Sequence, residues 1–372
     1  MDFTLTQAQD DLGGLTRSIL TDLVTQQRLR EIEAAGTGFD PALWANLAAA
    51  GVLSAALPES LGGAGLGLLE QCTVLAEVGR AVAPVPYLPS IALGATALAQ
   101  FGNPDQQRQW AGPAAHGKKV LAVALAEEDS DDPPRPATTA ERLAGGWQLT
   151  GTKTTVEAGL QAGLLLVAAM TSAGPAIFLV APEDQGVTVT PQEVTGGQGN
   201  AVVELASVEL ADDRVLGDAG QGQEITDWLV ARATIGLCAL QLGVAERALE
   251  LTAAYAQRRQ QFGKPIGSFQ AVSQRLADGY IDVEGIRLTL WQAAWRMDNG
   301  LPFSTELATA KFWAAEAGHR VAHTAVHVHG GVGIDVDGEV HRYFVAAKHN
   351  EFALGGATAQ LRKIGAELAA AG

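Results

Sequence analysis

At 372 residues the chain is longer than one ordinary domain, and we expect two or three packed domains of about 100–200 residues each. Hydrophobic residues make up 47% of the sequence, yet no apolar run approaches the roughly 20 residues of a membrane span. The 41 acidic residues outnumber the 25 basic ones, and the net charge of −16 argues against a nucleic-acid or anionic-membrane partner.

The N-terminus and the two cysteines indicate a reducing compartment. Met1 is followed by DFTLTQAQDDLGG, which has neither the basic start nor the apolar stretch of a secretory signal, so we expect a cytoplasmic location. Cys72 and Cys238 lie in apolar helical patterns and match no zinc or redox spacing. They are predicted to be buried, reduced thiols.

The first two segments differ in the spacing of their apolar residues. Residues 1–118 show helical spacing of apolar residues, as at Leu43, Trp44 and Leu47, and predict an N-terminal all-α domain. Residues 119–222 form short runs rich in Val, Leu and Ile, which predict strands of a middle β domain at 120–126, 164–169, 176–180 and 186–189. Within them the acidic, proline-containing segment 127–142 is interpreted as a solvated loop.

Helical periodicity returns in the third segment, residues 223–372. One apolar stripe includes Leu237, Leu240 and Leu249. A second stripe consists of Leu276, Tyr280, Val283 and Ile286. These stripes predict a C-terminal four-helix bundle. The chain as a whole is therefore expected to be an α+β multidomain protein.

Four local motifs occur in this order along the chain. They are Pro58 to Gly63 (PESLGG) followed by LAEVGR, the segment FGNPDQQ, the run Arg259 to Ile266 (RQQFGKPI) with Phe269-Gln270, and Val328 to Gly333 (VHGGVG) followed by His341-Arg342-Tyr343. Together they resemble the acyl-CoA dehydrogenase family across nearly the whole chain. The resemblance implies that family's fold: an N-terminal helical domain, a middle β-barrel-like domain and a C-terminal four-helix bundle.

The family's chemistry requires a carboxylate that removes an α-proton from an acyl-CoA thioester while a hydride passes to the flavin of FAD. Many members carry this Glu in a Glu-Gly-Thr loop before the last helix, where this chain has Gly355 or Gly356, depending on register. Other members carry it on the first bundle helix, where this chain has Ala233. No catalytic residue is therefore assigned, and Glu351 is the nearest fallback.

By resemblance, this chain departs from the family in one half of the FAD site, the half that contacts the flavin ring. Where the family places an aromatic residue and a hydroxyl against the flavin ring, this chain has Thr155 and Glu157. A carboxylate there would oppose a reduced, anionic flavin. We therefore expect this chain not to hold the flavin ring on its own β domain.

The contacts that the family makes to a neighbour's FAD are retained. By resemblance, Arg259 would meet the pyrophosphate and Phe262 the adenine, and Gly330 and Gly331 would allow the backbone to approach a phosphate. The same motifs contribute Ile266, Gln270 and His327, the last standing where Gln is common. The expected cofactor is FAD shared with a partner subunit.

Three histidines recur every four residues at His319, His323 and His327, a spacing that can bind zinc or nickel. No acidic or cysteine ligand joins them in sequence, and the residues between them suit a packed helix. No metal is expected.

These features resemble the non-catalytic subunit of actinobacterial heterotetrameric acyl-CoA dehydrogenases that act on sterol side-chain CoA thioesters in lipid metabolism. The expected partner is a catalytic acyl-CoA dehydrogenase subunit that carries the acyl-CoA substrate in an α2β2 heterotetramer and passes electrons to an electron-transfer acceptor. One alternative is a self-sufficient homotetrameric dehydrogenase with a non-standard base such as Glu351. The other is a non-enzymatic scaffold homologue that binds neither flavin nor CoA.

Overall fold

The computed structural model describes residues 4–128, 133–196, 199–218 and 220–371. The chain divides into two compact units, which we call the helical unit and the sheet unit. The helical unit comprises Met1–Gln26, Leu68–Ala83 and Thr234–Gly372, and the sheet unit comprises Gln27–Gly67 and Pro84–Ala233. The helices and strands follow the predicted order of helical, β and helical segments, while the predicted domain boundaries at 118/119 and 222/223 stay predictions.

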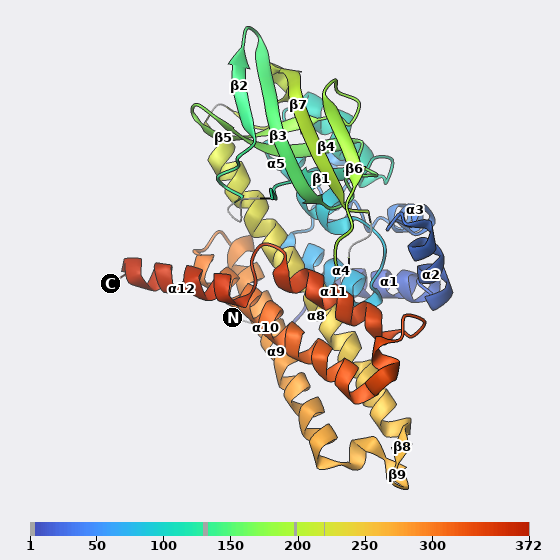
Figure 1. Ribbon diagram of the computed structural model, residues 1–372. Coiled ribbons are helices and arrows are strands. Elements are labelled where there is room, and N and C mark those ends of the chain that lie inside the picture. The colour runs from blue at the N-terminus through green and yellow to red at the C-terminus, as the bar shows by residue number, and fades with distance from the viewer. Residues whose placement is uncertain (1–3, 129–132, 197–198, 219, 372) are drawn as a thin grey trace. The chain divides into compact units, whose positions relative to one another are not determined.

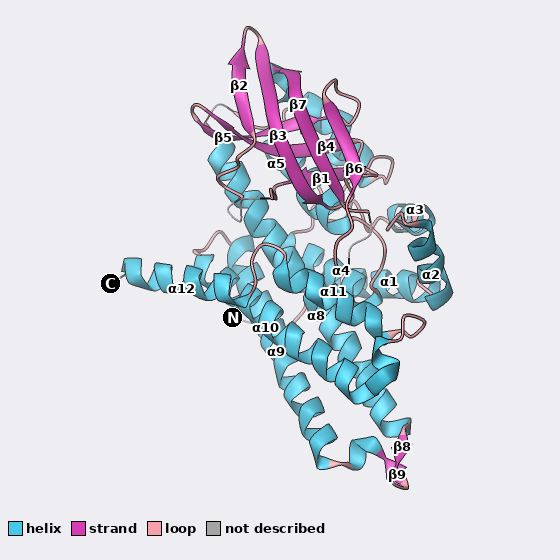
Figure 2. Ribbon diagram, in the orientation of Figure 1, coloured by secondary structure: helices cyan, strands magenta, loops and turns pink. Residues whose placement is uncertain are grey.

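The sheet unit contains one curled, seven-stranded sheet, drawn in magenta in Figure 2. Its strands are β1 (Leu121–Ala124), β2 (Thr139–Leu143), β3 (Gly146–Val156), β4 (Leu164–Thr171), β5 (Gly174–Val180), β6 (Val187–Pro191) and β7 (Ala201–Ala211). The order is β1-β4-β2-β3-β7-β6, and β5 pairs with β4. β1 lies parallel to β4, while the β2–β3, β3–β7, β6–β7 and β4–β5 pairs are antiparallel.

The four predicted strand runs are confirmed, and the sheet adds three strands that the run pattern missed. β3 and β7 alternate buried with exposed residues, so they lack the continuous apolar runs of β4. Their inward residues join an apolar core that includes Leu149, Leu165, Phe178, Val203 and Leu205. The signal for these strands was the alternation of apolar with polar residues, which a search for continuous apolar runs does not detect.

Apart from the first turns of α8 (Gly222–Arg258), the remaining elements of the sheet unit are short helices. They are α2 (Gln26–Ala35), α3 (Pro41–Ala49), α5 (Thr96–Phe101), α6 (Pro104–Gln106), α7 (Gly112–Ala115), the 3-10 turns Glu59–Leu61 and Asp212–Arg214, and the π-helical segments Tyr87–Ala95 and Gln107–Ala111. Asp40 caps α3 by accepting bonds from the backbone nitrogens of Ala42 and Leu43, and Arg28 holds the Asp40 carboxylate at 2.6 Å.

The helical unit is built from long helices. They are α1 (Gln7–Leu23), α4 (Leu68–Ala81), the later turns of α8 (Gly222–Arg258), α9 (Gln270–Asp298), α10 (Ser304–His329), α11 (Val340–Phe352) and α12 (Ala357–Ala371). The two-residue strands β8 (Gln260–Gln261) and β9 (Lys264–Pro265) form a hairpin between α8 and α9 at their far end (Figure 1). Short 3-10 turns occupy Ile266–Ser268 and Gly330–Ile334.

Two glycines set the approach of α4 to α8. A Cβ built on Gly79 would lie 2.0 Å from the Leu240 carbonyl oxygen, and one on Gly243 would lie 1.8 Å from the Ala76 oxygen. Only glycine permits backbones to pack this closely. α8 is the one helix among the described residues long and apolar enough to span a membrane, but 78% of its apolar window is buried, as in a core helix.

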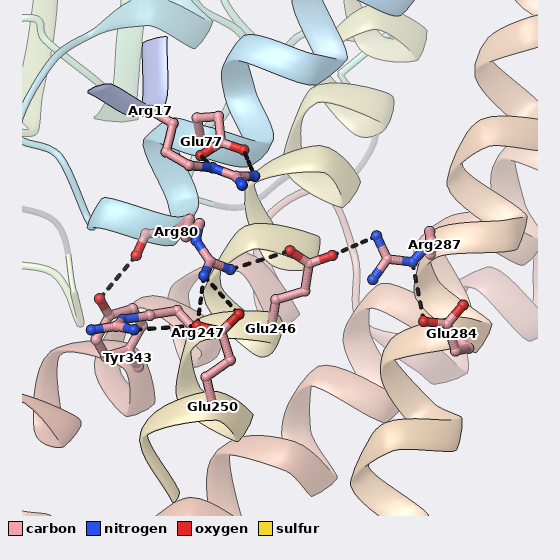
Figure 3. A network of polar contacts seen from close by, with 9 residues as sticks. All are labelled: Arg17, Glu77, Arg80, Glu246, Arg247, Glu250, Glu284, Arg287 and Tyr343. Carbon is pink, nitrogen blue, oxygen red and sulfur yellow. Dashed lines mark hydrogen bonds and ion pairs between the residues drawn. The ribbon is translucent and has the colours of Figure 1, made fainter. Parts of the chain in front are cut away.

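An ion-pair network joins α1, α4, α8, α9 and α11 inside the helical unit (Figure 3). Arg80 lies 2.5 Å from Glu250 and 3.6 Å from Glu246, and Arg287 lies 2.7 Å from the other oxygen of Glu246. The Tyr343 hydroxyl donates to the Arg80 carbonyl oxygen at 2.9 Å, which fixes α11 against α4. Burial raises the pKa of Glu246, so its arginine neighbours are needed to keep it charged.

Candidate functional site

The β8–β9 hairpin presents one aromatic side chain to the outside. Its two-residue turn places Phe262 at φ +53° and Gly263 at φ +76°, the paired left-handed conformation of a type I′ hairpin. Phe262 is 92% exposed, and its ring lies edge-on to that of Phe269, with 6.1 Å between centroids. A left-handed phenylalanine is strained by about 1–2 kcal/mol. The pairing of β8 with β9 holds this conformation and leaves the Phe262 ring open to contact with another molecule.

Arg259 stands beside this hairpin as an uncompensated cation. Its side chain is exposed and makes no hydrogen bond or ion pair with the described residues, although its backbone is fixed by bonds to Tyr255 and Ile266. From Glu250 to Asp278 the sequence contains four basic residues and no acid between them. This end of the helical unit is therefore locally positive in a chain of net charge −16, as an anion site requires.

The glycine turn lies at the end of α10. Gly330 has φ +64° and ψ −140°, a conformation essentially restricted to glycine, and a Cβ on Gly330 or Gly331 would meet no atom within 4 Å. The backbone here is open to an external group. The ring of His329 stacks on Tyr255 with centroids 4.3 Å apart, and this contact joins the end of α10 to the last turn of α8.

The stack brings the predicted cofactor residues to one end of the helical unit. Arg259 follows Tyr255 by one helical turn, while His327, exposed, precedes His329 by two residues. Ile266, half-buried, and Gln270, exposed, continue from the hairpin into α9. The C-terminal end of a helix carries partial negative charge, so the glycine turn suits an uncharged ring or sugar better than the phosphate first expected there.

The turn at residues 354–356 is firmly held although it carries no carboxylate. Gln360 donates its Nε2 to the carbonyl oxygens of Leu354 at 3.2 Å and Gly355 at 3.0 Å. Gly355 has φ +91°, and its Cβ would lie 3.0 Å from Ala359, whereas a Cβ on Gly356 would make ordinary contacts at 3.5 Å and beyond. A side chain therefore fits at position 356 and not at 355, which favours Gly356 as the residue replacing the base.

The other two positions considered for a base do not supply one. Ala233 is buried on α8 and has no ionisable group. Glu351 lies 2.9 Å from the Lys348 ammonium and 3.1 Å from the His319 ring. Burial alone would raise the pKa of Glu351, but Lys348 and His319 outweigh it and lower the pKa. A base for an α-proton needs the opposite shift, so the geometry argues against this fallback.

The strand position expected to wall the flavin ring is distorted. Thr155 has φ +49°, which is unusual for a β-branched residue, and lies at an irregularity in the β3–β7 pairing. Its backbone nitrogen donates to Gln192 at 2.6 Å, and its side chain is exposed. Glu157 nearby is half-buried. This segment keeps a bulged backbone but offers neither an aromatic face nor a hydroxyl.

The interpretation of residues 127–142 as a solvated loop is wrong at both of its described ends. Glu127 accepts bonds from Lys153 Nζ at 2.7 Å, Thr138 Oγ1 at 2.6 Å and the Thr138 nitrogen at 2.8 Å. Lys153 is fully buried, and residues 139–142 belong to β2. The acidic composition was misleading because one of its carboxylates is the buried partner of a lysine 26 residues away. Residues 129–132 lie outside the described part of the chain.

The histidines of α10 are arranged as follows. His319 and His323 have ring centroids 4.3 Å apart, while His319 contacts Lys348 and Glu351. In the described ranges no group of three or more His, Cys, Asp or Glu side chains is placed to hold a metal ion. Cys72 and Cys238 are buried free thiols, as predicted.

Comparison with known proteins settles the family. The N-terminal and C-terminal domain models of acyl-CoA dehydrogenase match residues 6–118 and 220–369. The chain is 52% identical to acyl-CoA dehydrogenase FadE27 of Mycobacterium tuberculosis over 99% of both proteins. The chain belongs to the acyl-CoA dehydrogenase family.

Two solved structures of heteromeric complexes are also similar. A chain of the ChsE4–ChsE5 complex from Mycobacterium tuberculosis has a TM-score of 0.95 and 52% identity, covering 99% of each chain. A chain from a variant of the Tcur3481–Tcur3483 steroid ACAD has a TM-score of 0.92 and 41% identity, again covering 99% of each chain. Members of the acyl-CoA dehydrogenase family are FAD-dependent oxidoreductases. The Phe262 hairpin, Arg259 and the open glycine turn fit the adenosine and pyrophosphate half of that cofactor.

Sequence reasoning missed one residue that shapes this acyl-CoA dehydrogenase chain. Lys311 is fully buried on α10 and donates to the carbonyl oxygens of Asn350 at 2.7 Å and Glu351 at 3.2 Å, at the end of α11. A lysine between Ala308 and Ala314 on an apolar helix face was the signal available in the sequence. Lys311 and Gln360 therefore hold the backbone on the two sides of the turn that carries Gly356.

Burial lowers the pKa of Lys311 to about 8, from its usual value of 10.5. Between these values the unfolded state of Lys311 binds more protons, so the contribution of Lys311 to the free energy of unfolding should rise with pH, by up to ~3 kcal/mol. Lys311→Met should lack this rise. Denaturant titrations from about pH 7 to pH 10.5 measure it, with exposed Lys118→Met as the control. Parallel pH profiles for wild type and Lys311→Met would contradict the assignment.

Proposed function

We propose that this chain is the non-catalytic subunit of a heteromeric, FAD-dependent acyl-CoA dehydrogenase and completes the FAD site of a catalytic partner. The observation that carries the proposal is the contrast between two regions of the helical unit. The hairpin holds Phe262 outward in a strained conformation beside Arg259, which has no ionic partner in the described chain. The turn at Gly356 offers no carboxylate, and the nearest one, Glu351, is ion-paired.

In this proposal each residue of the hairpin and glycine turn contacts a defined part of the FAD. Arg259 donates charge-assisted hydrogen bonds to the pyrophosphate, and Phe262 lies against the adenine ring. Gly330 and Gly331 admit the adenosine to an open backbone, and Ile266, Gln270 and His327 border it. Bound FAD would supply a hydride acceptor, and the partner would supply the carboxylate that removes the α-proton.

The two heteromeric structures support the proposed partner and substrate. The ChsE4–ChsE5 complex and the Tcur3481–Tcur3483 steroid ACAD support a partner that is itself an acyl-CoA dehydrogenase subunit. We propose an α2β2 assembly in the cytoplasm that α,β-dehydrogenates a steroid side-chain CoA thioester bound on the partner. An electron-transfer protein would reoxidise the flavin.

The FAD-to-chain ratio tests this function directly. Visible absorbance is measured for the chain purified alone, and again after co-expression with a homologue from the same source that has Glu at the position of Gly356. We expect no flavin on the chain alone and one FAD per pair of chains in the complex. A flavin on every isolated chain, bleached by an acyl-CoA, would establish a self-sufficient dehydrogenase. No flavin with any partner would establish a scaffold.

A further inference from the structure

His329 is a buried histidine at the end of α10. It is 8% exposed, and Ala325 and Val328 beside it are also buried. Its ring nitrogen Nδ1 lies 2.8 Å from the Ala325 carbonyl oxygen. Because a carbonyl oxygen only accepts hydrogen bonds, Nδ1 carries the proton and donates it, which fixes the orientation of the ring. Burial lowers the pKa of His329 and outweighs the opposite effect of this bond, so the ring is neutral near pH 7.

One face of this ring lies against Tyr255, which is half-buried on α8. The two ring centroids are 4.3 Å apart, and the ring planes meet at 26°. Stacked aromatic rings contribute about 0.5–1.5 kcal/mol beyond the area that they bury. Since the bond to Ala325 fixes the His329 ring on its own helix, the stack links the ends of α8 and α10 in a defined geometry.

The backbone of Tyr255 leads directly into the β8–β9 hairpin (Figure 1). The Tyr255 carbonyl oxygen accepts a bond from the Arg259 nitrogen at 2.8 Å, and the Arg259 carbonyl oxygen accepts one from the Ile266 nitrogen at 2.8 Å. The segment that follows the hairpin packs on the same turn of α8, because a Cβ on Gly267 would lie 3.1 Å from the Ala256 oxygen. A shift of Tyr255 would therefore move the hairpin with it.

His329 supports the glycine turn in a similar way. The Gly330 nitrogen follows it directly and donates to the carbonyl oxygens of Val326 and His327. The turn then folds back, because a Cβ on Gly333 would lie 2.9 Å from Val326 Cα and 3.1 Å from His329 Cβ. Only glycine permits this close approach. The position of His329 therefore sets the position of the open backbone that follows it.

We infer that Tyr255 and His329 form a positioning pair that holds the hairpin and the glycine turn at the separation at which both reach one FAD. The inference rests on the proposed function, in which Arg259 and the glycine turn contact the same cofactor. Tyr255 and His329 act through these two contacts and not on the FAD itself. Groups that are already held in the binding geometry avoid the entropic cost of ordering them when the ligand binds.

A positioning pair makes the two FAD contacts depend on each other. With the stack in place, one FAD meets Arg259 and the glycine turn together, so Arg259→Ala has its full effect. Without the stack, an FAD held at the glycine turn no longer finds Arg259 at the matching distance, so the same substitution costs less. A double-mutant cycle measures this coupling.

The experiment uses the complex of full-length chains with the catalytic partner, and equilibrium dialysis measures the FAD dissociation constant. His329→Leu keeps an apolar side chain but removes the ring, and Tyr255→Leu removes the other ring. We expect each variant to weaken FAD binding about tenfold. His329→Phe keeps a flat ring and should bind FAD within about threefold of wild type. His116→Leu, an exposed histidine of the sheet unit, is the matched control and should leave FAD binding unchanged.

The cycle combines His329→Leu with Arg259→Ala in the same complex. In this background Arg259→Ala should weaken FAD binding less than about threefold, against about tenfold or more in wild type. Hydrogen exchange of the chain alone tests the link without any FAD. His329→Leu should speed exchange of the Arg259 and Ile266 amides, whose bonds follow from Tyr255, while His329→Phe should not.

Unchanged FAD binding in both His329→Leu and Tyr255→Leu would overturn the inference and leave the proposed function standing. An equal loss in His329→Phe and His329→Leu would overturn it too, because stacking would then not be the role of the ring. A wild-type complex without FAD, together with faster amide exchange in His329→Leu, would refute the proposed function and leave the link between hairpin and glycine turn standing.

Discussion

Arg259→Ala and Phe262→Ala should each release FAD from the complex while leaving the fold of the chain intact. Neither side chain has a hydrogen-bonding or buried role among the described residues, so little intramolecular energy is lost. Loss of a charge-assisted hydrogen bond or an aromatic contact should weaken FAD binding by about 10-fold to 100-fold in each case. FAD retention is measured by equilibrium dialysis of the complex followed by visible absorbance.

A matched control and a second variant separate binding from folding. Arg258 is the neighbouring exposed cation, but it donates to its own helix at Ala254, so Arg258→Ala should retain FAD. Phe262→Gly removes the left-handed strain and should raise the free energy of unfolding by about 1 kcal/mol while still losing FAD. If the strained backbone at Phe262 serves FAD binding, Phe262→Gly should be more stable than wild type and should bind FAD more weakly. Normal FAD retention in both Arg259→Ala and Phe262→Ala would refute the assigned roles.

Glu127→Ala should destabilise the sheet unit by about 3–5 kcal/mol. Lys153 is fully buried, and without Glu127 its ammonium would be left without an ionic partner. The change also leaves the backbone nitrogens of Ala137 and Thr138 without an acceptor. Denaturant titration measures the loss, and exposed Glu141→Ala on β2 is the control, with an expected change within about 0.5 kcal/mol.

The same pair predicts a pH response. Burial opposes ionisation of Glu127, but the bonds from Lys153 and Thr138 outweigh it and lower the pKa below its usual 4.5. A depressed carboxyl pKa contributes stability above the unfolded value and loses it as pH falls through the folded value. Wild type should therefore converge on Glu127→Ala only below about pH 4.5. A loss under about 1 kcal/mol at neutral pH would show that the pair is not needed for folding.

The sequence alone determined the class of protein and one chemical limit on it. Local motifs such as Arg259 to Ile266 and the order of helical and strand patterns predicted the fold, because both depend on short-range spacing. The resemblance expects a base at the positions of Gly355 or Gly356 and of Ala233, and the sequence shows without coordinates that these residues are glycine and alanine. Residue identity is a covalent fact, and glycine and alanine cannot accept a proton in any conformation.

Tertiary structure decided which of the remaining groups are available. Glu351 could have served as a base until α11 and α10 brought Lys348 and His319 against it. The sequence predicted that Glu127 is solvated, but Lys153 on β3 binds its carboxylate. It also predicted that Tyr280 is buried, but this side chain is 61% exposed. Each outcome depends on contacts between segments far apart in sequence, or on their absence. Long-range contacts set the burial and the pKa of each side chain, so a sequence pattern of one to two helical turns does not predict either quantity.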